Sequence, residues 1–267
     1  MKKRLDIYLV ENNFFESREK ARAMIMAGNV YINNQKIDKP GSFIKPEDNV
    51  KIIGPKLEFV SRGGLKLKKA IEKFNIDLKN KICVDIGAST GGFTDCMLQN
   101  GAKKVFAIDV GYGQLAWKLR TDERVINFER TNIRYFDKTK IPDEIDFISV
   151  DVSFISLKLV LPVIKKLLGP EKFAVCLIKP QFEAGKDQVG KKGVVKDIEI
   201  HKQVVYNILD FIKNEVGFVV LDLDYSPIKG PEGNIEYLVY IKNSDDKNIV
   251  LLDNKINKII DESHKNL

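Results

Sequence analysis

Histidine and cysteine are scarce in this chain of 267 residues. It has two histidines, His201 and His264, and three cysteines with no Cys-x-x-Cys pair among them. A histidine-based metal centre and a Ser-His-Asp triad are therefore nearly excluded, and no metal site is expected. An odd number of widely spaced cysteines is typical of buried free thiols in a reducing compartment, and it argues against a disulfide framework.

Long apolar runs are also missing. No stretch approaches the roughly 20 apolar residues of a membrane helix, and the basic N-terminus is followed by too short an apolar segment for a signal peptide. These absences predict a soluble cytoplasmic protein without a membrane partner. The 44 basic and 37 acidic side chains leave a net charge of +7, which hints at a polyanionic partner without proving one.

The apolar pattern divides the chain near residue 60, and the first part has short elements. Ser17 is placed to cap a helix, and Gly28 is placed to end it. Asn33 and Asn34 form a turn between two strand-like pieces. A small domain of mixed helix and strand is expected here.

After Lys81, apolar strand segments alternate with helices. That alternation is typical of a parallel sheet with helices on both faces. The last two strand segments, residues 217–226 and 234–243, are separated by a short loop and are expected to pair antiparallel at one edge. Residues 244–267 are a polar tail, for which a terminal helix and disorder both remain open.

The strongest sign of a ligand is VDIGASTGGFTD, residues 84–95. A buried strand runs into Gly87, and glycines open the next helix, where backbone N–H groups favour anions. The spacing is not G-x-G-x-x-G, which counts against NAD or FAD. Asp109 ends the following strand, where a carboxylate is positioned for ribose hydroxyls. The loop resembles the S-adenosylmethionine site of Rossmann-like methyltransferases, and this assigns to the cofactor Asp85, Gly87, Ser89, Gly91, Gly92 and Asp109.

Four charged residues complete the pattern. Lys66 lies in SRGGLKL, Asp151 in DVSFISL, Lys179 in LIKPQFE and Glu236 in GNIEYL. Asp151 and Lys179 end strands of the predicted sheet and should converge near the glycine loop, since ligands bind at the carboxyl ends of parallel strands. Each alone is explained as a solvated charge. Together they resemble the Lys-Asp-Lys-Glu tetrad of ribose 2′-O-methyltransferases of the FtsJ type.

The N-terminal segment resembles the small RNA-binding domain first known from ribosomal protein S-four. With DVSFISL, LIKPQFEAG, KGVVKD and SPIKGPEGNIEYL, the chain over about residues 2–242 resembles the TlyA (hemolysin A) family of rRNA cytidine 2′-O-methyltransferases. The resemblance implies a small α+β domain over 1–60, a Rossmann-like, doubly wound α/β domain with a seven-stranded sheet over 61–243, and the tail 244–267. It also implies S-adenosylmethionine as cofactor and ribosomal RNA, free or in a subunit, as partner.

In this reaction the tetrad has to align the methyl donor with the acceptor and to remove one proton. A ribose 2′-hydroxyl is a poor nucleophile until it is deprotonated, whereas a sulfonium methyl is already electrophilic. The resemblance assigns Lys179 as the general base and Lys66 as a nearby cation that lowers its pKa. Asp151 then orients Lys179 or the donor, and Glu236 holds Lys66 or the ribose.

Several other side chains have two explanations. Phosphate contact and simple solvation both remain open for a group of basic residues, although the domain resemblance favours RNA: Arg4, Arg18, Lys20, Arg22 and Arg62. Trp117 and most tyrosines are expected in the core. Phe154 is a candidate contact for a nucleotide or the donor's adenine, and Ser153 and Ser156 are expected to cap helices.

Two other functions fit less well. A membrane-active hemolysin lacks a transmembrane run, a signal peptide or a strongly amphipathic basic helix. A pseudouridine synthase joined to an RNA-binding domain would have no use for the loop that resembles an S-adenosylmethionine site. Its catalytic Asp would also have to be Asp6, which lies inside the small domain. The methyltransferase is therefore preferred, without a prediction of which cytidine or which ribosomal subunit is modified.

Overall fold

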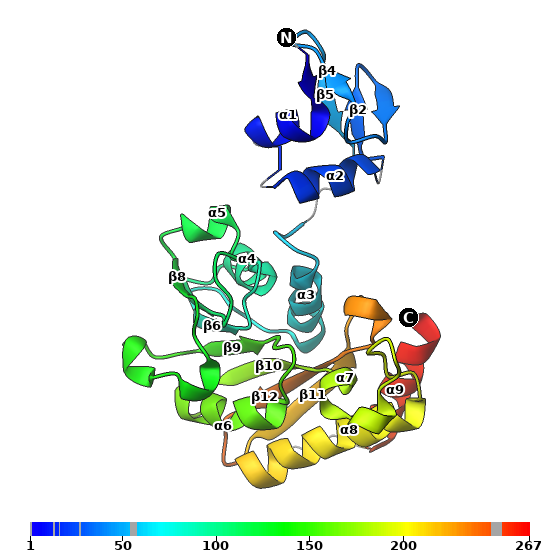
Figure 1. Cartoon of the computed structure of the whole chain (residues 1–267). Helices are drawn as coiled ribbons and strands as arrows, with labels where there is room; N and C mark the ends of the chain where they lie inside the picture. The colour runs from blue at the N-terminus through cyan, green and yellow to red at the C-terminus, as the bar shows by residue number, and fades with distance from the viewer. Residues whose placement is uncertain (1, 13, 16, 27, 54–57, 247–252) are drawn as a thin grey trace. The chain divides into compact units, whose positions relative to one another are not determined.

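The computed structural model describes residues 2–12, 14–15, 17–26, 28–53, 58–246 and 253–267. The chain forms two compact units, Met1–Lys56 and Leu57–Leu267, both drawn in Figure 1. In the described part of the chain, no helix is both long and apolar enough to cross a membrane.

The smaller unit packs two helices with short antiparallel strands. Its elements are β1 (Lys3–Arg4), α1 (Leu5–Glu11), α2 (Arg18–Met26), β2 (Val30–Ile32), β3 (Gln35–Ile37), β4 (Phe43–Ile44) and β5 (Val50–Ile52). One sheet has the order β3-β2-β5, and β1 pairs with β4. The buried core consists of Leu5, Leu9, Ala21, Ile25, Val30, Ile32 and Ile44.

Local signals in this unit confirm the predictions made for them. The Ser17 hydroxyl accepts a hydrogen bond from the Lys20 backbone N–H at the start of α2. Gly28, just beyond the end of α2, has a φ of 71°. Asn33 and Asn34 have φ values of 49° and 66° and join β2 to β3, as in a type I′ hairpin turn.

The larger unit is built on a seven-stranded mixed sheet, as predicted. Its strands are β6 (Ile82–Ile86), β7 (Lys104–Ile108), β8 (Val125–Phe128), β9 (Phe147–Val150), β10 (Phe173–Ile178), β11 (Val219–Tyr225) and β12 (Tyr237–Lys242). The order is β11-β12-β10-β9-β6-β7-β8. The strand β12 pairs antiparallel with both β10 and β11, so the predicted antiparallel hairpin is confirmed.

Helices cover both faces of this sheet. They are α3 (Gly63–Phe74), α4 (Gly92–Gln99), α5 (Trp117–Arg120), α6 (Leu157–Leu167), α7 (Pro180–Glu183), α8 (Ile198–Asp210) and α9 (Asp253–Asn266). Short turns of 3₁₀-helix occur at η1 (Ile133–Tyr135), η2 (Lys138–Lys140), η3 (Lys186–Gln188) and η5 (Pro231–Gly233), and a π-helical segment, η4 (Phe211–Val216), follows α8.

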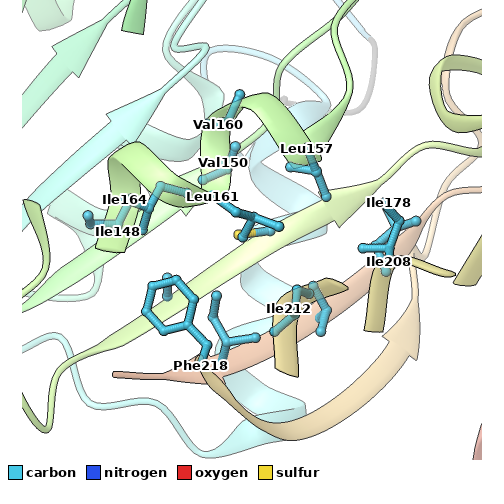
Figure 2. Packing of buried hydrophobic residues seen from close by; sticks show 14 of the residues in the cluster. Ile148, Val150, Leu157, Val160, Leu161, Ile164, Ile178, Ile208, Ile212 and Phe218 are labelled. Atoms are coloured by element: carbon cyan, nitrogen blue, oxygen red, sulfur yellow. The ribbon is translucent and has the colours of Figure 1, made fainter. Parts of the chain in front are cut away.

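Two apolar clusters fill the space between the sheet and its helices. One lies under α6, α8 and α9, and Figure 2 shows how side chains of α6 meet those of β9 and of the α8–η4 segment. The other lies under α3 and α4. The three cysteines, Cys83, Cys96 and Cys176, are buried in these clusters as free thiols, as expected.

The C-terminal segment, left open between helix and disorder, forms α9. Ile256, Ile259 and Ile260 are buried in the first cluster, and α9 packs against α8 and β11. The Ser263 hydroxyl lies 3.2 Å from the Tyr237 hydroxyl, a buried polar contact with the first residue of β12. The last helix therefore completes the larger unit, although its sequence is mostly polar.

Candidate active site

The carboxyl ends of four neighbouring strands meet at one edge of the large sheet. Gly87 directly follows β6, Asp109 follows β7, Asp151 follows β9 and Lys179 follows β10. This convergence follows from the parallel order of the strands, and it is where open α/β sheets bind ligands.

Two glycines allow the loop that follows β6 to pack closely against neighbouring segments. Gly87 has a φ of 84°, and a Cβ atom there would lie 2.4 Å from the carbonyl oxygen of Asp151. Gly91 has a φ of 95°, and a Cβ there would lie 2.2 Å from a methyl carbon of Leu119. At Gly87 the obstacle is backbone, so a side chain there would displace the loop; at Gly91 the close atoms are the ends of leucine side chains, and the positive φ is the stronger constraint.

The carboxylate of Asp109 faces a pocket of about 470 Å³, called the donor pocket below. Its Oδ2 accepts the Ser89 N–H at 2.8 Å, and its Oδ1 accepts the Gly111 N–H at 2.6 Å. A carboxylate has about four lone-pair sites, so both oxygens retain acceptor capacity for ribose hydroxyls. The pocket is lined by Ile86, Gly87, Ser89, Ile108, Asp109, Val110, Gln114, residues 131–133 and residues 151–155.

Asp85 has a different environment. It is fully buried, and it is not among the described residues that line the donor pocket. Its Oδ2 accepts the backbone N–H and the hydroxyl of Thr94, at 2.9 and 2.7 Å, and its Oδ1 accepts the Ser149 hydroxyl at 3.2 Å. Burial raises the pKa of Asp85 to about 7, with the hydrogen bonds from Thr94 and Ser149 opposing the shift. Asp85 thus ties α4 to β9 beneath the glycine loop.

The four residues of the expected tetrad lie together. Lys66 Nζ, from α3, is 2.6 Å from Glu236 Oε2 and 3.4 Å from Asp151 Oδ2. Lys179 Nζ forms an ion pair with Asp151 Oδ1 at 2.5 Å, without hydrogen-bond geometry. It also donates to the Ser153 hydroxyl at 3.2 Å. Asp151 therefore bridges both lysines, and Glu236 holds Lys66.

Burial and charge compete within the tetrad. Burial alone would lower the pKa of Lys66, but the carboxylates of Asp151 and Glu236 outweigh it and raise that pKa above its ordinary value. Burial alone would raise the pKa of Asp151, but Lys179 and Lys66 outweigh it and lower that pKa. For both Lys66 and Asp151, opposite charges nearby thus offset the cost of burying their own charge.

A smaller pocket of about 200 Å³, the tetrad pocket, opens onto these side chains. It is lined by Ser61, Gly63, Lys66, residues 87–89, Gly92, Phe93, Asp151, Ser153 and Lys179. The tetrad pocket and the donor pocket share Gly87, Ser89, Asp151 and Ser153. A methyl group held at this shared wall would therefore lie beside a hydroxyl held by the tetrad.

Two polar residues of the site were not expected from the sequence. Ser153 was predicted to cap a helix, and this is wrong, because Ser156 is the N-cap of α6 and the Ser153 hydroxyl instead accepts from Lys179. Ser156 does cap α6, as predicted, by accepting the Lys158 N–H. Gln181 Nε2 donates to Glu236 Oε1 at 3.1 Å. Ser153 and Gln181 both lie within two residues of a tetrad member, which is the one signal that points to them.

Exposed aromatic residues on the loops of the larger unit correct another prediction. Trp117 was expected in the core but is 71% exposed, and Tyr112 and Tyr135 are similarly exposed. All three lie on short connections that follow β7 and β8, where an apolar residue has no sheet to cover it. Phe154 is 91% exposed at the donor pocket, and its ring centroid lies 5.1 Å from that of Phe182.

The smaller unit places its basic residues around one buried acid. Arg4 and Arg18 both donate to Asp6, which is fully buried. The Arg4 hydrogen bond, together with Arg18, holds the pKa of Asp6 well below its usual range despite burial. Both arginines remain about half exposed. Lys20 and Arg22 are exposed on α2, and Arg62 is exposed at the start of α3 in the larger unit. Contact of these residues with RNA stays a prediction.

Comparison with known proteins identifies the family. Residues 59–243 match the FtsJ-like methyltransferase family, and residues 3–50 match the S4 domain. The chain is 49% identical to YqxC of Bacillus subtilis, with 100% of this chain and 95% of that protein covered. It is 40% identical to the 16S/23S rRNA (cytidine-2′-O)-methyltransferase TlyA of Mycobacterium tuberculosis, with 91% of each chain covered. A solved structure from Streptococcus thermophilus has a TM-score of 0.77 and 44% identity and covers 99% of this chain and 96% of its own. The chain therefore belongs to the TlyA (hemolysin A) family, in which an S4 domain precedes an FtsJ-like, S-adenosylmethionine-dependent methyltransferase domain.

Proposed function

We propose that the protein methylates the ribose 2′-hydroxyl of a cytidine in ribosomal RNA, with Lys179 as the general base. The observation that carries the proposal is the shared wall of the donor and tetrad pockets, with Asp151 bridging two lysines beside it. The substrate is inferred from the Mycobacterium tuberculosis relative, whose name specifies rRNA and the cytidine 2′-oxygen.

The donor pocket fits the proposed cofactor. Asp109 offers carboxylate oxygens for the ribose hydroxyls, and Gly87 presents backbone without a side chain at the pocket wall. Bound there, S-adenosylmethionine supplies a sulfonium methyl group that is already electrophilic. The protein then has to orient the acceptor and take one proton.

We assign the removal of that proton to Lys179, which lines the tetrad pocket. In its neutral form Nζ carries a lone pair, which accepts the 2′-hydroxyl proton while the oxygen bonds to the methyl carbon and the carbon–sulfur bond breaks. The resulting ammonium group lies beside Asp151, which stabilises it until the proton passes to water. Lys66 remains a cation because Glu236 and Asp151 both hold it. We assign Lys66 and Glu236 to orienting Asp151 and the ribose.

Phe154 and the smaller unit have proposed roles in binding RNA. Phe154 presents an exposed ring at the donor pocket, suited to stacking on the base of the target nucleotide. We assign Arg4, Arg18, Lys20 and Arg22 to phosphate contacts, which position RNA without reading its sequence.

Mapping of the methylated position tests the proposal. Purified protein is incubated with labelled S-adenosylmethionine and with rRNA, as free RNA or as isolated subunits, and the product is digested and analysed by mass spectrometry. The expected product is 2′-O-methylcytidine at a defined position. An RNA fragment with 2′-deoxycytidine at that position is the matched control and should stay unmodified. Label on a base, or no label on free rRNA or on either subunit, would contradict the proposal.

A further inference from the structure

Beyond Glu236, the catalytic edge of the sheet continues into a third pocket of about 890 Å³. One wall is the segment 188–197, which follows α7 at the carboxyl end of β10. A second wall is the loop 229–235, which leads into β12, and His264 and Leu267 complete the lining. The first residue of β12, Tyr237, pairs with Ile178, the last residue of β10. The pocket therefore opens at the same edge as the tetrad.

Four lysines line this pocket: Lys191, Lys192, Lys196 and Lys229. All four are exposed, and over the residues that the structure describes none of them forms an ion pair. Two acids also line the pocket, and one of them, Asp197, accepts the Glu199 N–H as the cap of α8. The pocket thus presents more positive than negative side chains to solvent, and no ion-pair partner of its lysines occurs in the part of the chain that the structure describes.

Buried polar groups hold the lysine-bearing segment in place. Asn234, which is 4% exposed, accepts the Val195 N–H at 3.3 Å and donates to the Gly193 carbonyl at 2.9 Å. His201, fully buried, lies with Nε2 2.9 Å from the Val195 carbonyl, so Nε2 carries the hydrogen. The turn is closed by a hydrogen bond from the Gly190 N–H to the Val194 carbonyl. Lys191 and Lys192 therefore project from a turn whose backbone is held by hydrogen bonds, which lowers the backbone entropy lost when they bind an anion.

The loop that lines this pocket also contacts the tetrad. Gly230 follows Lys229, and a Cβ atom on Gly230 would lie 2.3 Å from Glu236 Oε1. The backbone beside Lys229 thus packs against the carboxylate that holds Lys66. A nucleic-acid strand whose ribose lies at the tetrad would place its neighbouring phosphates in this pocket.

We propose that the lysine pocket, defined by Lys191, Lys192, Lys196 and Lys229, binds the phosphate backbone next to the target nucleotide. The inference rests on the proposed function and adds the surface that holds the flanking RNA. Lysine ammonium groups act as point charges on phosphate and carry no base preference. The pocket therefore supplies affinity and placement of the strand.

The test is the full-length triple variant Lys191→Ala/Lys192→Ala/Lys229→Ala. Its matched control is Lys79→Ala/Lys103→Ala/Lys213→Ala, which removes the same charge from exposed lysines at the opposite, amino edge of the sheet. Binding of an rRNA fragment is measured as a function of salt. With about 0.7 counterions released per phosphate contact on a single strand, three lost contacts should reduce the slope of log K against log salt by about 2. Relative to equal binding at 1 M salt, this change in slope corresponds to roughly 40-fold weaker binding of the variant than of wild type at 0.15 M salt.

Kinetics and cofactor binding separate this inference from the proposed function. We expect the lysine-pocket variant to raise the KM for rRNA, while kcat at saturating RNA and S-adenosylmethionine affinity stay at wild-type values. Equal RNA affinity, salt slope and KM in wild type and variant would overturn the inference while the proposed function stands. An equal loss in the control variant would also overturn it, because the effect would then be one of net charge. Absence of 2′-O-methylation by the wild-type protein would instead overturn the proposed function.

Discussion

At the scale of single residues, the two lysines of the tetrad have different neighbours. Lys66 contacts two carboxylates, whose charges raise its pKa. Lys179 contacts one carboxylate and the Ser153 hydroxyl, and it lines the tetrad pocket. A group held as a cation from two sides is a poor proton acceptor, so we assign the base to Lys179 rather than to Lys66.

Replacement of Lys179 by alanine should therefore abolish chemistry without abolishing binding. General-base effects are typically worth about 10²–10⁴ in rate, so single-turnover methylation of rRNA should fall by that order. Lys179→Arg should fail as well, because arginine stays protonated and cannot accept a proton. S-adenosylmethionine affinity, measured by calorimetry, is the control and should be nearly unchanged. Near-normal single-turnover methylation by Lys179→Arg would reduce Lys179 to a positioning cation.

Asp85 gives a prediction about pH and stability. Burial raises its pKa to about 7 from an ordinary value of 3.8. Between these two values the folded protein holds a proton that the unfolded chain has released, so the stability that this group contributes falls as pH rises through the window. The effect is about 1.4 kcal/mol per pH unit. Asp85→Asn cannot titrate, so wild type should gain stability relative to this variant as pH falls from 7 to 5.

Urea unfolding of both proteins at several pH values measures that difference. Because each protein carries the same remaining carboxylates, their titration cancels in the comparison. A constant difference in the free energy of unfolding from pH 5 to 7 would show that Asp85 is ionised in the folded protein, contrary to the prediction.

At the scale of helices and strands, the sequence predicts what depends on neighbours along the chain. The Asn33–Asn34 turn, the Ser156 cap and the hairpin of β11 and β12 each follow from local residue types, and all three are present. The convergence of Asp151 and Lys179 follows from the parallel order of strands. Contacts between residues far apart in the sequence were harder to predict. The hydrogen bonds of Lys179 with Ser153 and of Lys66 with Glu236 depend on how separate elements pack, which no local sequence pattern determines.

The exposure of side chains was also difficult to predict from the sequence, at Trp117 and in α9. An apolar residue is placed in the core by type alone, but Trp117 begins a four-residue helix in which only Leu119 is buried. In α9 the opposite happens, because a polar composition conceals one apolar stripe, at Ile256, Ile259 and Ile260. Spacing along a helix, rather than composition, decides which of these side chains meets the core.

That stripe predicts that α9 contributes to the stability of the larger unit. Ile260 is fully buried against α8 and β11, so Ile260→Ala should lower the free energy of unfolding by about 2–5 kcal/mol. Lys258→Ala, on the exposed side of the same helix, is the matched control and should change it by about 0.5 kcal/mol or less. Urea unfolding measures both. Equal, small effects of the two substitutions would mean that α9 unfolds separately from the sheet.

At the scale of the whole molecule, each of the two compact units has a core of its own. The donor pocket, the tetrad pocket and the lysine pocket are all lined by residues of the larger unit. The smaller unit carries exposed arginines around Asp6 and matches a domain family of its own. This division predicts that the larger unit performs chemistry and that the smaller unit supplies affinity for RNA.

A protein that begins at Glu58 should therefore fold and bind S-adenosylmethionine as the full chain does, because every lining residue of the donor pocket is retained. It should methylate rRNA poorly at physiological salt and recover partly when salt is lowered, since its remaining phosphate contacts strengthen there. Binding of the full chain to rRNA should also fall more steeply with salt than binding of the shortened protein, because more counterions are released. Full-length Arg22→Ala, which removes one exposed cation of α2, should lie between the two. Equal methylation by the full-length and shortened proteins at physiological salt would remove the smaller unit from substrate recognition and leave the lysine pocket and Arg62 as the surfaces that hold RNA.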